Sequence, residues 1–280
     1  MAFRIDCKLH YSVAERSTYI MTIAAARTAA QQVIEDALSI APECAADDNL
    51  AAETGTRTHR FVAPRGDLSV RYTARVAPRY EVLDPERLPV TPPDRLPLSH
   101  VPYIVPSRYC QSDQIMRFAF REFAGYRPGH AQVSAICDWI YKHVDYQAGS
   151  TGPMTTAVDT LVERAGVCRD FAHLGVAFCR ALNIPARFVS GYAYDLSPPD
   201  FHAVFEAWLN GRWCLFDPTR RVSRTGFVRI GTGRDAADVP FALIIGRTSL
   251  QTMQVQCWHE PEPDGRDTPV VTELPVAVAA

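Results

Sequence analysis

The sequence predicts an α+β protein, a class that three stretches of the chain support. Residues 68–76 alternate apolar and polar side chains, as a half-exposed strand does. Residues 166–185 carry apolar side chains at helical spacing and end in Asn-Ile-Pro, which stops a helix. Residues 202–217 divide into two short apolar runs around Asn-Gly, the strongest short hairpin signal. The chain therefore combines helices with antiparallel strands.

A proline-rich stretch marks the boundary between two predicted domains. Residues 84–106 hold seven prolines, which exclude the interior of a helix or a sheet, so we expect an extended surface linker. A partner-binding role for this stretch is the alternative. The predicted parts are a β-rich domain at 1–83, the linker, a domain of helices and strands at 107–260 and a tail at 261–280.

The N-terminal region is expected to be mostly β. Residues 3–9 and 17–25 are rich in strand-forming side chains, and Pro-Arg-Gly-Asp at 64–67 predicts a turn. The stretch 29–40 is ambiguous, because its apolar positions also fit a helix. Residues 41–58 are polar and are expected to form a loop.

Helices are expected to lead into residue 166, and strands to follow the hairpin. Asp113 is the expected N-cap of the first helix. The apolar end of the tail either adds an edge strand or frays. The predicted helices are 113–126, 130–146 and 155–165, and the later strands are 241–245 and 251–259, with the tail edge at 276–280.

Composition and charge exclude several classes of protein. The formal net charge is −2, which gives no reason to expect a nucleic-acid partner. The N-terminus lacks the apolar segment of a signal peptide, and no run approaches the roughly 20 apolar residues of a membrane helix. The eight cysteines form no CxxC pair, and no ligand cluster is evident. We therefore expect a cytoplasmic protein with no metal and no cofactor, of open oligomeric state.

Cys168 is the strongest candidate nucleophile. It begins a predicted helix just after Gly166, where free backbone N–H groups and the positive end of the helix dipole stabilise a thiolate. Arg169 adds positive charge nearby. The same N–H groups can stabilise an oxyanion on an attacked carbonyl. For Cys168 alone, a buried structural cysteine is the alternative.

The hairpin adds a histidine and an aspartate on one face. A two-residue turn pairs Leu209 with Arg212, and this register carried along the strands places Val204 opposite Asp217. It also places His202 opposite Thr219. Asp217 is then diagonal to His202, about 6–8 Å away between Cβ atoms, a gap that the two side chains can span. A carboxylate there can orient the imidazole and stabilise its charged form.

These segments resemble the bacterial transglutaminase-like proteins of the papain-like cysteine enzyme superfamily. The resemblance covers most of the chain and implies a papain-like catalytic domain, with the nucleophile helix packed on an antiparallel sheet. It also favours a strand for the ambiguous stretch 29–40. The segments that carry it are GVCRDFAHL (166–174), CRALNIPARFVSGY (179–192), HAVFE (202–206), WCLFDPT (213–219) and GRDAADVP (233–240).

The resemblance implies a role for each member of a triad. Cys168 is the nucleophile, His202 the general base and acid, and Asp217 the orienting carboxylate. One position departs from the family, which usually has Trp two residues after the histidine, where this chain has Val204. That difference puts the shape of the substrate site in doubt more than the triad. Glu206 is kept and is a further candidate for the cleft.

Other candidate residues of the site are less defined. A second oxyanion donor is expected upstream of the nucleophile helix, and spacing does not choose between Tyr146 and Gln147. Arg234 and Asp235 either line the cleft or form a solvated ion pair. These residues complete the predicted site.

The predicted reaction is acyl transfer through a thioester on Cys168. Hydrolysis of a peptide, isopeptide or other amide is favoured, because nothing in the sequence marks a site for an amine. The alternatives are protein-glutamine transamidation, which crosslinks proteins, and a catalytically silent papain-like fold that acts as a binding or scaffold protein. No acidic loop of the kind that binds calcium is present.

Overall fold

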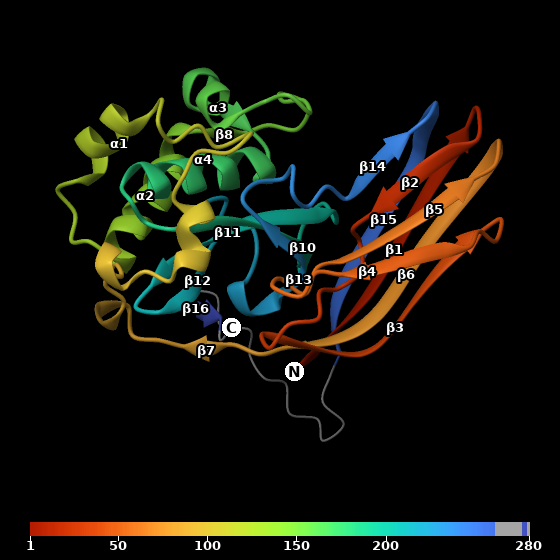
Figure 1. Cartoon of the computed structure of the whole chain (residues 1–280), viewed down its shortest axis with the longest axis horizontal. Coiled ribbons are helices and arrows are strands. Elements are labelled where there is room, and N and C mark those ends of the chain that lie inside the picture. Colours follow the sequence, from red (N-terminus) through yellow and green to blue (C-terminus); the bar gives the residue numbers. More distant parts are fainter. Residues whose placement is uncertain (261–275, 279–280) are drawn as a thin grey trace.

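The computed structural model describes residues 1–260 and 276–278, which form two joined halves (Figure 1). The helices gather over one half, and long antiparallel strands make up the other. The α+β class predicted from the sequence is confirmed. Within the described residues, no helix combines the length and apolar character needed to cross a membrane.

The N-terminal half contains two four-stranded antiparallel sheets. One has the order β15-β1-β6-β3, with bounds Thr248–Glu260, Ala2–Val13, Gly66–Pro78 and Gln31–Ala41. The other has the order β14-β2-β5-β4, with bounds Ala242–Ile245, Ser17–Met21, Arg57–Ala63 and Ala46–Leu50. Buried positions alternate along β1 and β6, and side chains of both sheets, among them Phe3, Tyr72 and Phe61, form one core.

The other half has a six-stranded sheet and four α-helices. The sheet order is β13-β10-β11-β12-β16-β7, with bounds Phe227–Gly233, Ala186–Ala193, Phe201–Leu209, Arg212–Phe216, Val276–Val278 and Glu81–Val82. The helices are α1 Met116–Phe123, α2 His130–His143, α3 Ala157–Glu163 and α4 Cys168–Ala181. A short 3₁₀ turn η4, Arg224–Gly226, precedes β13. All four predicted helices are confirmed, with shorter ends for the first three.

Helix α4 lies against strand β11 at close range. Gly175 makes this approach possible, because a Cβ there would lie 2.5 Å from the Phe205 ring. Phe171, Phe178 and Phe205 are buried in the core between helices and sheet. Burial of each such ring stabilises the fold by roughly 1.5–3 kcal/mol. This packing fixes the direction in which the start of α4 points.

Two local predictions are wrong. The stretch 41–58 was expected to be a loop, but β4 lies within it and pairs with β5, since charged side chains suit a fully exposed edge strand. Asp113 was expected to cap the first helix, but α1 begins at Met116 with Ile115 at its N-cap. The ambiguous stretch 29–40 forms β3, so the strand prediction is confirmed.

The proline-rich stretch 84–106 is not an extended linker. It forms three 3₁₀ segments, η1 Pro85–Arg87, η2 Pro93–Arg95 and η3 Leu98–Tyr103. Leu88 is buried, and its carbonyl accepts a hydrogen bond from the backbone N–H of His130 at 2.9 Å. Val90 bridges to Leu209 at the end of β11. Proline fits short 3₁₀ turns that need few N–H donors, and apolar side chains between the prolines anchor them to the domain.

The strands after the hairpin return to the N-terminal half. β14 pairs with β2, and β15 pairs with β1 along its whole length. They lie within the predicted domain 107–260, yet their hydrogen bonds complete the N-terminal sheets. In the tail, β16 adds a strand to the sheet, but not the edge strand that was one of the two predicted outcomes, because it pairs with β12 on one side and with β7 on the other. Residues 261–275 and 279–280 lie outside the described residues.

Candidate active site

Cys168 is the first residue of α4, as predicted. Its side chain is half-buried, and Asp170 fixes the turn that carries it. The Asp170 carboxylate accepts hydrogen bonds from the Val167 N–H at 2.9 Å and from the Thr151 hydroxyl at 2.6 Å. A Cβ at Gly166 would lie 2.8 Å from the Asp170 Cβ, so glycine is needed there. The thiol is therefore held at a helix start, among free backbone N–H groups.

Two very short strands bring the predicted oxyanion candidates to the nucleophile. β8, Asp145–Tyr146, runs parallel to β9, Ala165–Gly166. The N–H of Gln147 donates to the Gly166 carbonyl at 2.9 Å. Burial and then the charge of Cys168 raise the pKa of Tyr146 to about 12. The Tyr146 hydroxyl therefore lies beside Cys168, where a neutral phenol can donate a hydrogen bond.

The hairpin has the predicted turn and register. Asn210 and Gly211 have φ values of 47° and 77°, as a type I′ turn requires. Pairing runs from Leu209–Arg212 to Phe205–Phe216, where β12 ends. The expected pairs of Val204 with Asp217 and of His202 with Thr219 lie beyond this ladder. Asp217 has left the strand and belongs to the turn that follows.

His202 and Asp217 meet in the protein interior. His202 Nε2 lies 3.3 Å from Asp217 Oδ2, and both side chains are almost fully buried. The other bonds to the carboxylate come from the turn after it. Asp217 Oδ1 accepts from the Thr219 N–H at 2.9 Å and its hydroxyl at 2.7 Å, and Oδ2 accepts from the N–H groups of Arg221 at 3.2 Å and Val222 at 3.3 Å. The turn therefore fixes the carboxylate that orients the histidine.

The charges of the pair favour an imidazolium beside a carboxylate. Burial alone would lower the pKa of His202, but the charge and hydrogen bond of Asp217, together with the Cys168 thiol, raise it to about 10. Burial opposes ionisation of Asp217, yet His202 and the Thr219 bonds hold the pKa of this carboxyl below its usual range. With Nε2 directed to Asp217, Nδ1 is the ring nitrogen left for Cys168, and it makes no hydrogen bond with a described residue.

The remaining predicted site residues are engaged elsewhere. Arg169 donates to the Gly152 carbonyl at 2.7 Å and pairs with Asp170. Arg234 pairs with Asp238 at the surface, and Asp235 is buried and accepts from the Tyr109 N–H at 2.8 Å. The bonds of Arg234 and Asp235 hold a loop, not the triad.

Two residues of the hairpin have buried side chains that contact other parts of the protein and do not line a substrate cleft. Glu206 is fully buried between Arg187 and Arg229. Val204 lies in a small apolar cluster with Ala30, at the position where the family usually has Trp. Its burial places this departure in the packing between the two halves of the molecule.

Sequence reasoning missed the supports of the triad. Asp170 was counted only as part of a motif, although an acid at the third position of a helix is a known N-terminal signal. The Asp-Pro-Thr start of the turn after β12 also signals a side chain that bonds N–H groups two residues on. Among the described residues, no group of three or more His, Cys, Asp or Glu side chains is placed to hold a metal.

The same chain regions match known proteins. The model of the Transglutaminase-like superfamily matches residues 117–218, and that of the Bacterial transglutaminase, N-terminal domain, matches residues 1–91. The crystal structure of a candidate cysteine protease from Cytophaga hutchinsonii is 41% identical, with a TM-score of 0.93. That comparison covers 100% of this chain and 98% of the other, so the fold extends over the whole molecule.

Two mycobacterial proteins without an assigned function are also similar. An uncharacterized protein of Mycobacterium leprae is 37% identical over 116 residues, which are 38% of this chain and 41% of that protein. One of Mycobacterium tuberculosis is 33% identical over 144 residues, which are 46% of each. The chain thus spans less than half the length of these curated relatives.

Proposed function

The chain belongs to the transglutaminase-like superfamily, and from this premise we propose that it is a cysteine-dependent acyl-transfer enzyme. Cys168 acts as the nucleophile, His202 as the base and acid, and Asp217 as the carboxylate that orients His202. The observation that carries the proposal is the buried His202–Asp217 pair at 3.3 Å, whose imidazole also interacts with the Cys168 thiol. We place this catalytic unit within the predicted domain 107–260.

The proposed reaction begins from a thiolate–imidazolium pair, in keeping with the raised pKa of His202. His202 Nδ1 holds the proton of Cys168 Sγ, and the thiolate attacks the carbonyl carbon of an amide. The backbone N–H groups at the start of α4, with Tyr146 or Gln147 as a second donor, stabilise the oxyanion. The intermediate collapses, the C–N bond breaks, and His202 gives its proton to the departing amine. A thioester remains on Cys168.

The molecule that then attacks the thioester, the acceptor, decides the final product of the reaction. Water gives hydrolysis, and an amine gives a new amide; in both cases His202 takes a proton from the acceptor and returns it to the thiolate. We propose a peptide or protein amide as substrate, and hydrolysis as the reaction. The eight cysteines all lie in the described residues and form no disulfide, which supports the cytoplasm as the proposed compartment.

A two-acceptor assay tests the proposal. The full chain is incubated with a panel of peptide amides and glutamine-containing peptides, with and without a primary amine, and products are identified by mass spectrometry. The proposal requires acid products that are lost in Cys168→Ala. Amine adducts in place of acids would identify transamidation. No product, together with no covalent thioester on Cys168, would favour the scaffold alternative.

A further inference from the structure

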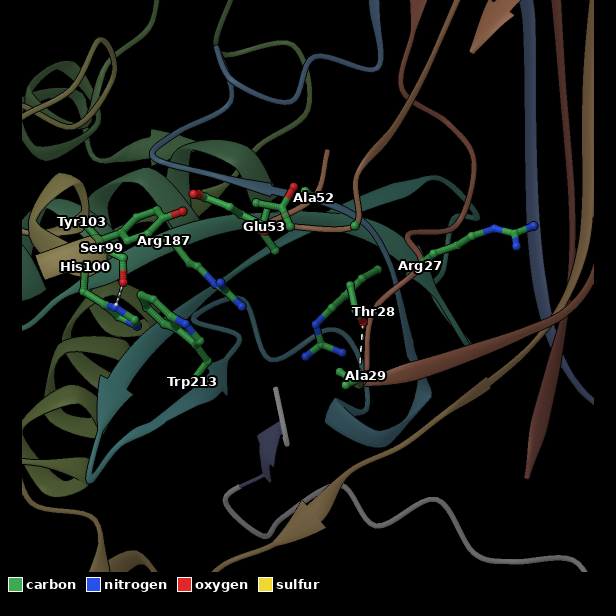
Figure 2. Close-up of a pocket in the computed structure, with 15 residues that line it drawn as sticks. Arg27, Thr28, Ala29, Ala52, Glu53, Ser99, His100, Tyr103, Arg187 and Trp213 are labelled. Carbon is green, nitrogen blue, oxygen red and sulfur yellow. Dashed lines mark hydrogen bonds between the residues drawn. The ribbon is translucent and has the colours of Figure 1, made fainter. Parts of the chain in front are cut away.

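A cavity lies away from the proposed triad, where three parts of the chain meet (Figure 2). Loops of the N-terminal half form one wall, the 3₁₀ segment η3 forms another, and the six-stranded sheet forms the floor. Its volume is about 540 Å³, within the range of roughly 300–1,000 Å³ that small-molecule sites occupy. None of Cys168, His202 and Asp217 lines it.

The floor of the cavity holds two arginines that share one carboxylate. Glu206 Oε2 accepts from Arg187 Nε at 2.7 Å, and Oε1 accepts from Arg229 Nη2 at 2.8 Å. The exposed fractions of the three side chains are 0% for Glu206, 6% for Arg229 and 15% for Arg187. Two guanidinium groups therefore face one buried carboxylate. The excess positive charge is costly unless an anion compensates it.

In the wall from the N-terminal half, two arginines again share one carboxylate. Arg27 lines the cavity and pairs with Asp36 at 3.4 Å, and Asp36 also pairs with Arg57. Glu53 is the acid of the lining, and its side chain is exposed. The cavity is therefore locally positive in a chain whose formal net charge is −2.

Two polar atoms of the lining are buried without a partner. His100 Nε2 and Thr232 Oγ1 make no hydrogen bond with a described residue. Burial, and then the charge of Arg187, lower the pKa of His100, so its ring is neutral near pH 7. Unpaired polar atoms are rare in protein interiors, and each is expected to have a partner in the functional state.

The sheet side also offers an aromatic edge. The Arg187 guanidinium lies 4.1 Å from the centre of the Trp213 ring, and the His100 ring stacks on the same ring at 5.1 Å and 12°. Figure 2 shows His100, Arg187 and Trp213 together on one side of the cavity, whereas Arg27 lies on the opposite side with its side chain directed away from them. A ligand can thus contact charge and an aromatic edge at once.

We propose that this cavity binds a small organic oxyanion, a phosphate or carboxylate carried by a compact aromatic or apolar group. Its oxygens bind between Arg187 and Arg229, and it also bonds the Thr232 hydroxyl. Arginine matches such oxygens with paired N–H donors. Because the walls come from both halves of the molecule and from η3, the bound ligand holds these three parts together.

Calorimetric titration of the full chain tests this proposal. The probes are phenyl phosphate, benzoate and inorganic phosphate, each in chloride buffer of constant ionic strength. We expect one site per chain, with phenyl phosphate or benzoate bound more tightly than inorganic phosphate and with a Kd below about 1 mM. The tighter of the two aromatic probes tells phosphate from carboxylate. No saturable heat for any probe at 10-fold higher concentration would overturn the proposal.

Three variants locate the site. Thr232→Val is expected to weaken binding about 5- to 10-fold, since it removes one ligand contact. Arg27→Gln should leave the Kd nearly unchanged, because the Arg27 guanidinium pairs with Asp36 and is directed away from the cavity. Arg60→Gln removes an exposed arginine of β5 outside the cavity and should leave the Kd unchanged. Thr232→Val should also raise the Tm of the ligand-free protein, because it removes an unpaired buried hydroxyl. Equal weakening by all three variants would indicate an effect that does not arise in the cavity and would contradict the site.

The site can be tested independently of catalysis. Cys168→Ala should bind the probes as the wild type does, because Cys168 does not line the cavity. Binding that survives in an inactive enzyme would uphold the site even if the proposed reaction were wrong. Loss of binding in Cys168→Ala, with the fold intact by circular dichroism, would contradict the separation of the two sites.

Discussion

Strand β11 carries two buried charge clusters, four residues apart and on one face. At His202, an imidazole with a pKa raised to about 10 meets one carboxylate and a thiol. At Glu206, a carboxylate meets two guanidinium groups, which do not release protons near neutral pH. Both clusters are buried, yet only the first has a group that can exchange a proton with a neighbouring thiol.

The difference shows that buried charge alone does not identify a catalytic site. A cluster of permanent charges can bind a ligand or stabilise the fold. Acid–base chemistry also needs a titratable group beside a nucleophile. The family resemblance marked both His202 and Glu206 as candidates for one site. The structure separates them, since the Glu206 bonds go to Arg187 and Arg229. Mutations at the two clusters should therefore affect different properties.

The largest expected effect is the loss of activity in Cys168→Ala. Removal of a nucleophile costs at least about 10⁴-fold in kcat/KM. Stability should change by less than about 1 kcal/mol, since the side chain is small and half-buried. Cys44→Ala is the matched control in the N-terminal half and should keep full activity. Activity retained in Cys168→Ala would remove Cys168 from the mechanism.

Asp217→Asn should lower kcat/KM by about 10²–10⁴-fold and change the pH profile. The carboxylate raises the pKa of His202 to about 10, so the imidazolium persists until high pH in the wild type. Without that charge, burial dominates and lowers the pKa, so the alkaline limb of the rate profile should move to lower pH. The profile is measured with an amide substrate from the panel. An unshifted alkaline limb would show that Asp217 does not set the charge of His202.

Glu206→Gln should act on stability and not on the thiol. The change leaves two buried guanidinium groups without their carboxylate, and loss of a buried partner costs about 3–5 kcal/mol in the free energy of unfolding. Denaturant unfolding measures this loss. Glu81→Gln breaks an exposed pair with Arg212 and should cost less than about 1 kcal/mol. If Glu206→Gln abolished Cys168 reactivity in a folded protein, the two clusters would not be separate.

The smallest expected effect is at the hairpin turn. Gly211 has a φ of +77° with open space around its Cα, so Gly211→Ala should cost about 1 kcal/mol through backbone strain alone. Gly125 also has open space but no positive φ, so Gly125→Ala should not destabilise the protein. A neutral Gly211→Ala would mean that the type I′ turn does not position the strand of His202.

Much of the fold was predictable because local chemistry and tertiary structure agree. The Asn210–Gly211 turn set the register of the hairpin, and helical spacing located α4. The predictions that were wrong concern segments whose structure depends on contacts with residues far away in the sequence. β4 is a charged strand that exists because β5 pairs with it, and the 3₁₀ segments of 84–106 form against a domain that composition does not reveal.

For the proposed site, the sequence predicts the residue types and not the hydrogen bonds that hold them. Cys168, His202 and Asp217 followed from a helix start and a shared face, together with the family resemblance. The bonds that fix Asp217 come from backbone N–H groups of Arg221 and Val222, which any residue could supply, so no side-chain pattern marks them. The separation of Glu206 from the triad required Arg187 and Arg229, which lie on two other strands.

The most direct test of the catalytic proposal is the pH dependence of iodoacetamide alkylation, followed for each cysteine by peptide mass spectrometry in the wild type and in His202→Ala. We predict that Cys168 reacts fastest near neutral pH in the wild type, that it slows at least tenfold in His202→Ala, and that the buried Cys110, Cys179 and Cys214 react slowly in both. A Cys168 as inert as these buried cysteines at every pH, or equally reactive without His202, would contradict the proposed thiol–imidazole pair.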